Sequence, residues 1–360
     1  MKNAHAPTQP HEMWSRVRFL VVAWLLVLLA GAPRPSRTQR PRLGGAVNIF
    51  SRYGYLSISM KVVPRNETDT WIFREPTLDV FRNPTPITAG RQRQQGKATT
   101  PIFDGDFHME FCDNVRQLLQ AYFRDFSFEG LERPWRAFTG SWSKAAIAKH
   151  LGINSSFISG DYSYVLVRVA RFRDRQKLAA TAESMILDET VFRETENITV
   201  GDTASVVRFI RNFGSHYIAA YITGNSLYQV FVYTPRVYLD IKERLKTHGV
   251  ARLASNELST YFSPWGAEHI GSIQAASGNR TVETWAIERL RRTERIYVFA
   301  SLLNLHDNAT LLKQLDGLLE NEALLQLHLR TLAPVFKDLK RREWFLEVID
   351  NYFKLWEVNM

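Results

Sequence analysis

Residues that could carry nucleophilic or metal chemistry are few in this chain. His108 and Cys112 stand four residues apart, the spacing at which two metal ligands share one face of a helix. One such pair does not make a site, because zinc takes three or four protein ligands. The sequence contains no HExxH, GxSxG, Walker-A or GxGxxG motif. It therefore predicts no catalytic activity, no metal and no cofactor, and it leaves His216 as the remaining candidate.

His216 is expected at the junction between a helix and a long extended segment, in DTASVVRFIRNFGSHYIAAYITGNSLYQVFVY (residues 202–233). Asp202 or Thr203 can cap this helix, and Gly214 stands where a residue of positive φ ends one. We interpret His216 as a structural histidine that hydrogen-bonds across the sheet or the helix end. Apolar side chains recur at helical spacing before the junction, at Val206, Phe209, Ile210 and Phe213.

The extended segment after Gly214 allows two interpretations. Gly224-Asn225 is a two-residue turn signal, which predicts a hairpin. Alternatively, Gly224 is a kink within one strand that runs from His216 to Tyr233. Such a strand would be about 60 Å long, whereas an ordinary strand has about 5 to 6 residues. Propensity does not choose between the two.

The rest of the chain alternates between extended and helical patterns. Its 360 residues are 45% apolar, enough for one large domain or two smaller ones. The polar segment 83–101 contains three prolines and is expected to be an exposed insertion. The order of the patterns predicts an α+β fold. Extended patterns cover 47–63, 162–173 and 295–305, and helical patterns cover parts of 112–151, 174–190, 236–276 and 309–356.

The N-terminus carries the pattern of a secretory signal peptide. Arg16 and Arg18 precede the apolar run 19–32, which is too short for a comfortable membrane span and ends in a small-residue cleavage site. We therefore expect residues 1–32 to be a signal peptide and the protein to be extracellular, with a retained signal anchor as the alternative. Residues 33–46 are basic and proline-rich and are expected to form a disordered arm.

Five N-x-S/T sequons also favour secretion, and their asparagines are predicted to be glycosylated and exposed. They are Asn66, Asn154, Asn197, Asn279 and Asn308. Cys112 is the single cysteine, so an intramolecular disulfide cannot form. It is either a buried free thiol or a possible intermolecular bond.

The charge of the chain favours anionic partners. The formal net charge is +10, and +8 remains when residues 1–32 are removed. A basic extracellular protein adheres to anionic cell surfaces, eggshell or matrix. The export signal argues against nucleic acid as a partner, and the oligomeric state stays open.

The junction resembles the signature of the membrane attack complex/perforin (MACPF) family. That signature is an aromatic-Gly-Thr/Ser-His-aromatic run followed by a long strand with small residues at its bend. This chain has Gly224-Asn225 where the family usually has Gly-Gly. The match is clearest over residues 160–234 and extends over about 50–306. The matching run is Phe213, Gly214, Ser215, His216 and Tyr217.

Within this family the chain is most similar to the insect torso-like proteins, which are short secreted chains. The resemblance implies a bent four-stranded antiparallel sheet flanked by two helical clusters, in a domain over 47–306 with a helical extension over 307–360. It also favours one kinked strand over a hairpin. Torso-like proteins act outside the cell in localised activation of the receptor tyrosine kinase Torso and in growth control. The implied partner is an extracellular protein ligand or its receptor pathway.

Pore formation is the alternative function. Pore-forming members unfold both helical clusters into membrane-crossing hairpins, whose strands need about 9 to 11 residues of alternating polarity. In the second predicted cluster, 236–280, a refolded strand would turn Glu243 towards lipid. The first, 101–160, contains Pro134 and also lacks sustained alternation. The residues therefore favour stable helices and a non-lytic protein.

The predicted C-terminal helix has two interpretations. Its apolar stripe can dock on the domain, or the basic helix can contact a membrane or a partner. The stripe consists of Phe345, Val348, Tyr352 and Trp356.

Overall fold

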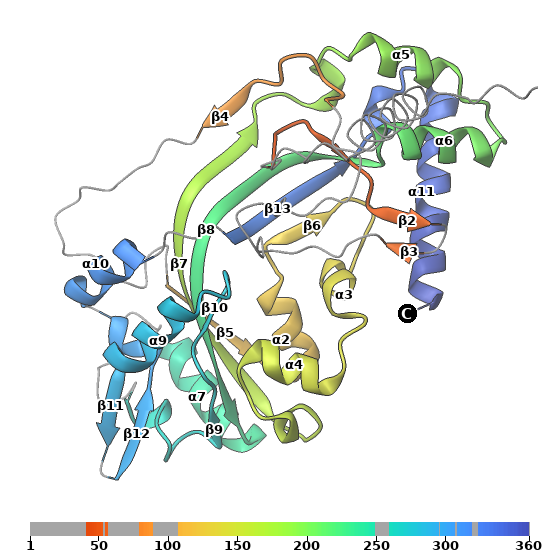
Figure 1. The fold of residues 1–360 in the computed structure, drawn as a ribbon. Coiled ribbons are helices and arrows are strands. Elements are labelled where there is room, and N and C mark those ends of the chain that lie inside the picture. The colour runs from red at the N-terminus through yellow and green to blue at the C-terminus, as the bar shows by residue number, and fades with distance from the viewer. Residues whose placement is uncertain are drawn as a thin grey trace, which may run out of the picture. The chain divides into compact units, whose positions relative to one another are not determined.

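Two long antiparallel strands, β7 (Ser163–Leu178) and β8 (His216–Tyr233), run side by side through the fold (Figure 1). The segment after Gly214 is therefore one 18-residue strand, and the hairpin interpretation of Gly224-Asn225 is wrong. The computed structural model describes residues 41–52, 55–56, 79–88, 107–248, 259–294, 296–306, 308–318 and 323–359. All belong to the unit Arg40–Met360, so the predicted signal peptide, 1–32, lies outside the described residues.

The main sheet has nine described strands in the order β4-β7-β8-β13-β6, with four short strands added at its edges. Pairing is antiparallel except between β6 and β13, which are parallel. The expected count of four strands is wrong, because short segments of two to six residues add to the long strands where their edges are not already paired. The four added strands are β1 (Ala46–Val47), β5 (Phe107–Cys112), β9 (His269–Ile270) and β10 (Gln274–Ala275). The other strands in the order above are β4 (Pro86–Thr88), β6 (Phe126–Phe128) and β13 (Ala323–Thr331).

The two long strands curve along their length (Figure 1), and Gly224 lies near the middle of β8. A Cβ atom at this position would stand 2.0 Å from the carbonyl oxygen of Arg171 on β7, far inside any allowed contact. Opposite this point, the register of β7 shifts between Phe172 and Asp174, as at a β-bulge. Bulges bend strands and increase their twist. Glycine therefore permits the two backbones to meet where the bulge adds a residue.

Below the bend, alternate side chains of β7 and β8 enter two separate cores. Val165, Val167 and Phe231 face α7, α9 and α10, whereas Leu166 and Val230 face α2 and α4. Period-two alternation thus places helices on both faces of the same strands. The helices are α2 (Val115–Tyr122), α3 (Pro134–Thr139), α4 (Lys144–Leu151), α7 (Pro235–His248), α9 (Arg280–Arg289) and α10 (Ala309–Leu318).

A third core forms around the start of β8, where α6 (Thr203–Phe213) and α11 (Leu339–Asn359) pack. The predicted stripe of α11 is buried, so the docking interpretation of this helix is confirmed. The remaining elements are β2 (Phe50–Arg52), β3 (Tyr55–Leu56), α5 (Glu189–Glu196), β11 (Arg291–Glu294), β12 (Tyr297–Ala300) and the 3-10 turns Ser155–Ile158, Ala182–Ser184, Leu302–Leu305 and Ala333–Val335.

Several boundaries predicted from the sequence differ from those in the structure. The expected helix over 174–190 is wrong, because β7 continues to Leu178 to pair with β8. The tail 307–360 is not wholly helical, since β13 is a strand beside β8 whose Leu324, Leu327 and Leu329 enter the core that holds α6 and α11.

The arm expected to be disordered and the insertion expected to be exposed also differ in part from these expectations. The end of the arm 33–46 is ordered, because Ala46 pairs with Tyr217 on β8. In the segment 83–101, residues 86–88 form β4, and residues 89–101 lie outside the described part.

Replacing Gly224 with alanine should lower the free energy of unfolding by about 2 kcal/mol or more, because the new methyl group overlaps the Arg171 carbonyl. Urea denaturation followed by circular dichroism measures this loss. Gly317→Ala is the matched control: it lies in α10 with nothing within 4 Å of the added atom, and should be neutral or slightly stabilising. Equal stability of the two variants would contradict the close-approach explanation.

Candidate functional site

The junction Gly214-Ser215-His216 joins α6 to β8 and is the first candidate site. Asp202 caps α6 by accepting a hydrogen bond from the Ala204 amide, and Gly214 ends the helix with φ of 94°. A Cβ on Gly214 would lie 2.9 Å from the Val47 backbone. The sequence therefore requires glycine here both for backbone conformation and for contact with β1.

The His216 ring is fully buried and hydrogen-bonded at both nitrogens. Its Nε2 lies 3.0 Å from the Glu129 carbonyl oxygen, and its Nδ1 lies 2.9 Å from Ser215 Oγ. Burial lowers the pKa of His216 from 6.5 to about 4, so the ring is neutral near pH 7. Because a carbonyl only accepts, Nε2 carries the proton and the Ser215 hydroxyl donates to Nδ1.

Ser215 extends this contact to two further parts of the chain. Its Oγ accepts a hydrogen bond of 3.2 Å from the Ile49 amide, and its carbonyl accepts one of 3.0 Å from the Leu332 amide. The carboxylate of Glu129 accepts a hydrogen bond of 2.9 Å from the Thr331 amide. The junction thus ties β8 to the N-terminal segment, the loop after β6 and the end of β13.

This geometry fits a structural role for His216, as the sequence analysis proposes. Ser215 and His216 have no exposed surface, so a substrate cannot reach the hydroxyl unless the junction opens. Phe213 and Tyr217, the aromatic residues of the signature, are also buried in the core that holds α6 and α11. The signature residues 213–217 therefore lie together at the junction between α6 and β8.

The His108–Cys112 pair does not form a ligand set. Both residues lie on β5, where four residues span about 13 Å rather than one helical turn. No group of three or more potential metal ligands occurs among the described residues. Cys112 is buried, and burial raises the pKa of its thiol to about 12, which fits the buried-thiol interpretation.

A clasp connects the two helical layers at the lower end of β7 and β8. The Asp113 carboxylate, just before α2, accepts hydrogen bonds of 2.8 Å from Tyr238 Oη and from Lys242 Nζ, both on α7. These hydrogen bonds, that from Lys242 first, lower the pKa of Asp113. Sequence reasoning missed this contact because residues 113 and 238 are joined only by tertiary structure.

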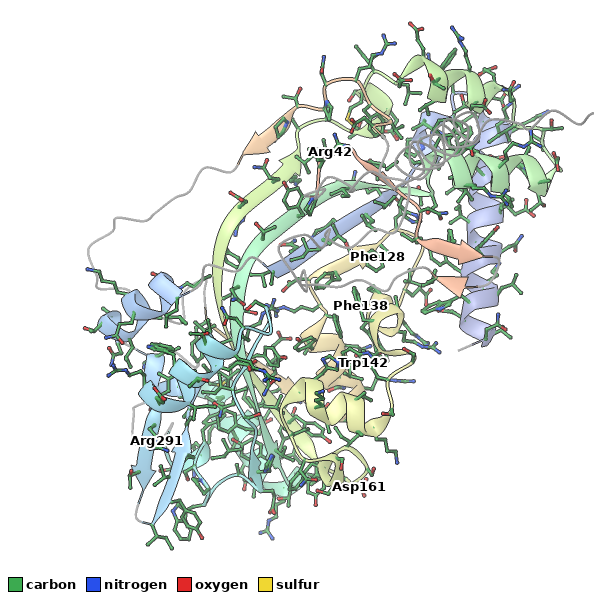
Figure 2. All side chains as sticks on the ribbon, viewed as in Figure 1. Arg42, Phe128, Phe138, Trp142, Asp161 and Arg291 are labelled. Atoms are coloured by element: carbon green, nitrogen blue, oxygen red, sulfur yellow. The ribbon has the colours of Figure 1, made fainter. Side chains whose placement is uncertain are left out.

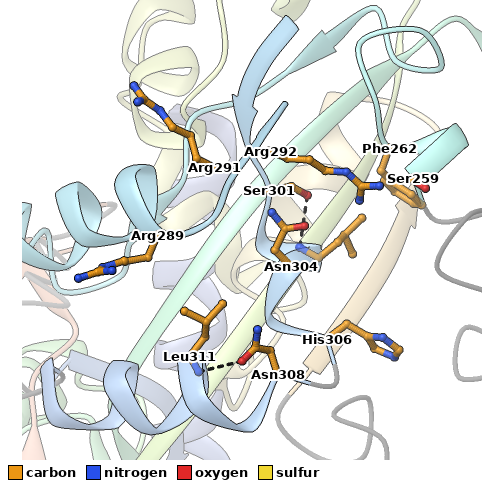
Figure 3. Close-up of a pocket in the computed structure, with 11 residues that line it drawn as sticks. Ser259, Phe262, Arg289, Arg291, Arg292, Ser301, Asn304, His306, Asn308 and Leu311 are labelled. Atoms are coloured by element: carbon orange, nitrogen blue, oxygen red, sulfur yellow. Dashed lines mark hydrogen bonds between the residues drawn. The ribbon is translucent and has the colours of Figure 1, made fainter. Parts of the chain in front are cut away.

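A cavity of about 430 Å³ beside the 3-10 turn Leu302–Leu305 is a polar feature that sequence reasoning missed (Figure 3). Three arginines line it, and none of the lining residues that the structure describes is acidic. Figure 3 shows Arg292 directed towards Phe262 and Ser259, while Arg289 and Arg291 point away from Arg292. The lining also contains Ser301, Asn304, His306, Asn308 and Leu311.

The predicted glycosylation sites differ in exposure. Asn154 and Asn197 are exposed, whereas Asn279 and Asn308 are half-buried and accept hydrogen bonds from the Thr281 and Leu311 amides. Asn66 lies outside the described residues.

No protein-family model matches the chain, and no curated protein matches it either. Solved structures similar to it include a putative cell invasion protein with a MAC/perforin domain from Bacteroides thetaiotaomicron, at 10% identity and TM-score 0.41, covering 89% of this chain and 61% of that one. GNIP1Aa from Chromobacterium piscinae matches at 11% identity and TM-score 0.44, covering 87% and 57%.

The third structure is astrotactin-2, a vertebrate-specific, perforin-like membrane protein involved in neuronal development. It matches at 13% identity and TM-score 0.32, covering 81% of this chain and 96% of that one. The chain spans about three fifths of the first two structures. Structural neighbours thus include MACPF/perforin-domain proteins, but scores this low carry no argument for function.

The stability of the protein should fall as the pH is lowered from 6.5 to about 4, because His216 is protonated in the unfolded chain but stays neutral in the folded one. The contribution of His216 to this loss is roughly 3 kcal/mol. Urea denaturation at both pH values measures it. His216→Gln, which cannot titrate, should be less stable at pH 7 and should lose less stability over this interval. An unchanged pH dependence in the variant would contradict the assignment.

Proposed function

We propose that this chain is a secreted, non-lytic protein of the MACPF fold that acts as a localised extracellular cue. It promotes ligand activation of a receptor tyrosine kinase of the Torso type and performs no catalysis. The signature residues at the α6–β8 junction and the bent pair β7–β8 support the fold assignment. The receptor pathway rests on the resemblance to torso-like proteins.

The packing of α7 carries the non-lytic part of the proposal. Tyr238, Ile241 and Leu245 are buried against β7 and β8, so unfolding α7 would expose them. The Asp113 clasp adds two hydrogen bonds that would also break. In a refolded strand, Glu243 would face lipid, where a carboxylate is unfavourable.

Pore formation remains the second candidate because helices cover both faces of the lower sheet, α2 and α4 on one and α7, α9 and α10 on the other. In pore-forming MACPF proteins, helices in the predicted positions become membrane hairpins. None of the described helices is long and apolar enough to cross a membrane as it stands.

The purified protein should release little dye from loaded liposomes, whether these are neutral or anionic, because both helical layers are held in the folded core. Fluorescence dequenching measures the release, and a known pore-forming MACPF protein serves as the positive control. Robust leakage together with arc or ring oligomers in electron micrographs would reverse the preference for a non-lytic protein.

Cells that express the Torso receptor should show more receptor phosphorylation when they receive the ligand together with this protein than when they receive the ligand alone. The measurement is a phosphotyrosine blot of the precipitated receptor. The Gly224→Ala variant provides a matched control of the same size and charge. Equal phosphorylation with and without the wild-type protein would contradict the proposed role.

A further inference from the structure

The β11–β12 hairpin presents a cluster of exposed apolar side chains. Ile296 is 83% exposed, Val298 58% and Tyr297 43%, and Trp265, 56% exposed, has its ring 5.2 Å from that of Tyr297. The hairpin lies at the lower end of the ribbon, with its turn directed away from the main sheet (Figure 1). Single exposed apolar residues are common in proteins, but four together mark an interaction surface.

Apolar side chains stand on both faces of the hairpin tip. Tyr297 and Val298 are consecutive residues of β12, so their side chains point to opposite faces. Across the hairpin, Val298 pairs with Thr293 and Tyr297 pairs with Glu294, so no apolar side chain of β11 covers either of them. A protein partner with a flat surface could bury only one of the two faces, whereas the lipids of a membrane can surround the whole tip.

The base of the hairpin is firmly attached to β8. The buried Gln229 side chain donates hydrogen bonds of 2.8 Å to the Ala300 carbonyl and 2.9 Å to the Gly271 carbonyl, and accepts one of 2.9 Å from the Leu302 amide. The Ser301 amide donates to the Leu290 carbonyl over 3.1 Å. The exposed tip therefore projects from a fixed base.

Basic side chains surround this base. Arg289 and Arg291 are exposed, and Arg292, which is half-buried, lines the same cavity. Figure 2 labels Arg291 on β11, and Figure 3 shows Arg291 and Arg292 directed to different sides of the hairpin. Positive charge is thus presented on both sides, behind the apolar tip.

We propose that the β11–β12 hairpin docks this protein on an anionic phospholipid surface. Trp265 and Tyr297 supply the aromatic side chains that favour the membrane interface, and Ile296 and Val298 enter the boundary between headgroups and acyl chains. The arginines meet lipid phosphates, as basic groups near membranes do.

Docking of this kind does not cross the bilayer and does not depend on the proposed signalling role. Each strand of the hairpin has four residues, about 13 Å, whereas a spanning strand needs about 9 to 11 residues. The hairpin is therefore a surface anchor.

Cosedimentation of the full secreted chain with vesicles tests the proposal. The protein should bind vesicles of phosphatidylcholine and phosphatidylserine more tightly than phosphatidylcholine alone, and salt should weaken the binding. The double variant Ile296→Ser, Val298→Ser should bind the anionic vesicles at least about tenfold more weakly, because two inserting side chains are lost. Thermal melts verify that it is folded.

The matched control is Ile186→Ser, Val358→Ser, which changes two residues that are 69% and 83% exposed on other elements and should bind as the wild type does. Equal loss of binding in both double variants would overturn the proposal. So would absence of vesicle binding, or binding to immobilised heparin alone, which would assign the basic surface to a sulfated glycan. A hairpin-dependent dimer in light scattering without vesicle binding would assign the tip to self-association and overturn it too.

Discussion

The buried junction at Ser215 and His216 is the constraint on which the fold depends. Its hydrogen bonds bring together segments near residues 47, 129 and 332 and fix the point where β8 begins. A neutral imidazole can donate at one nitrogen and accept at the other, so His216 satisfies two buried groups without a buried charge. Glycine at 214 lets β1 lie against the same turn. This geometry fits a structural role for the histidine.

From that starting point, β8 organises both helical layers. Its alternating side chains enter separate cores, one covered by α2 and α4 and the other by α7, α9 and α10. Gln229 faces the second layer, and its side-chain amide hydrogen-bonds to the 3-10 turn Leu302–Leu305 and to the end of β12. If the helices on either face unfolded, the close packing of their apolar side chains against β7 and β8 would be lost. This loss is the physical reason for favouring a non-lytic protein.

Surface features carry the interactions that we propose. The apolar tip at Ile296 and the arginines behind it lie outside the cores. Separation of this kind allows a rigid scaffold to present a binding element on a short connection. The composition shows that the chain is basic, and the tertiary structure places three of its arginines, Arg289, Arg291 and Arg292, around one cavity.

The sequence alone determined features that depend on neighbouring residues: a helix start at Asp202 or Thr203, the helix end at Gly214, and the apolar stripe of α11. It did not decide between hairpin and single strand at Gly224; the family resemblance favoured one strand. Only the tertiary structure decided it, because β8 pairs with β7 from Ala220 to Tyr233, on both sides of Gly224, which satisfies the backbone of one continuous strand. Long-range pairing also turned 323–331 into a strand and joined Asp113 to α7. Such contacts are absent from local patterns because their partners lie a hundred or more residues away in the chain.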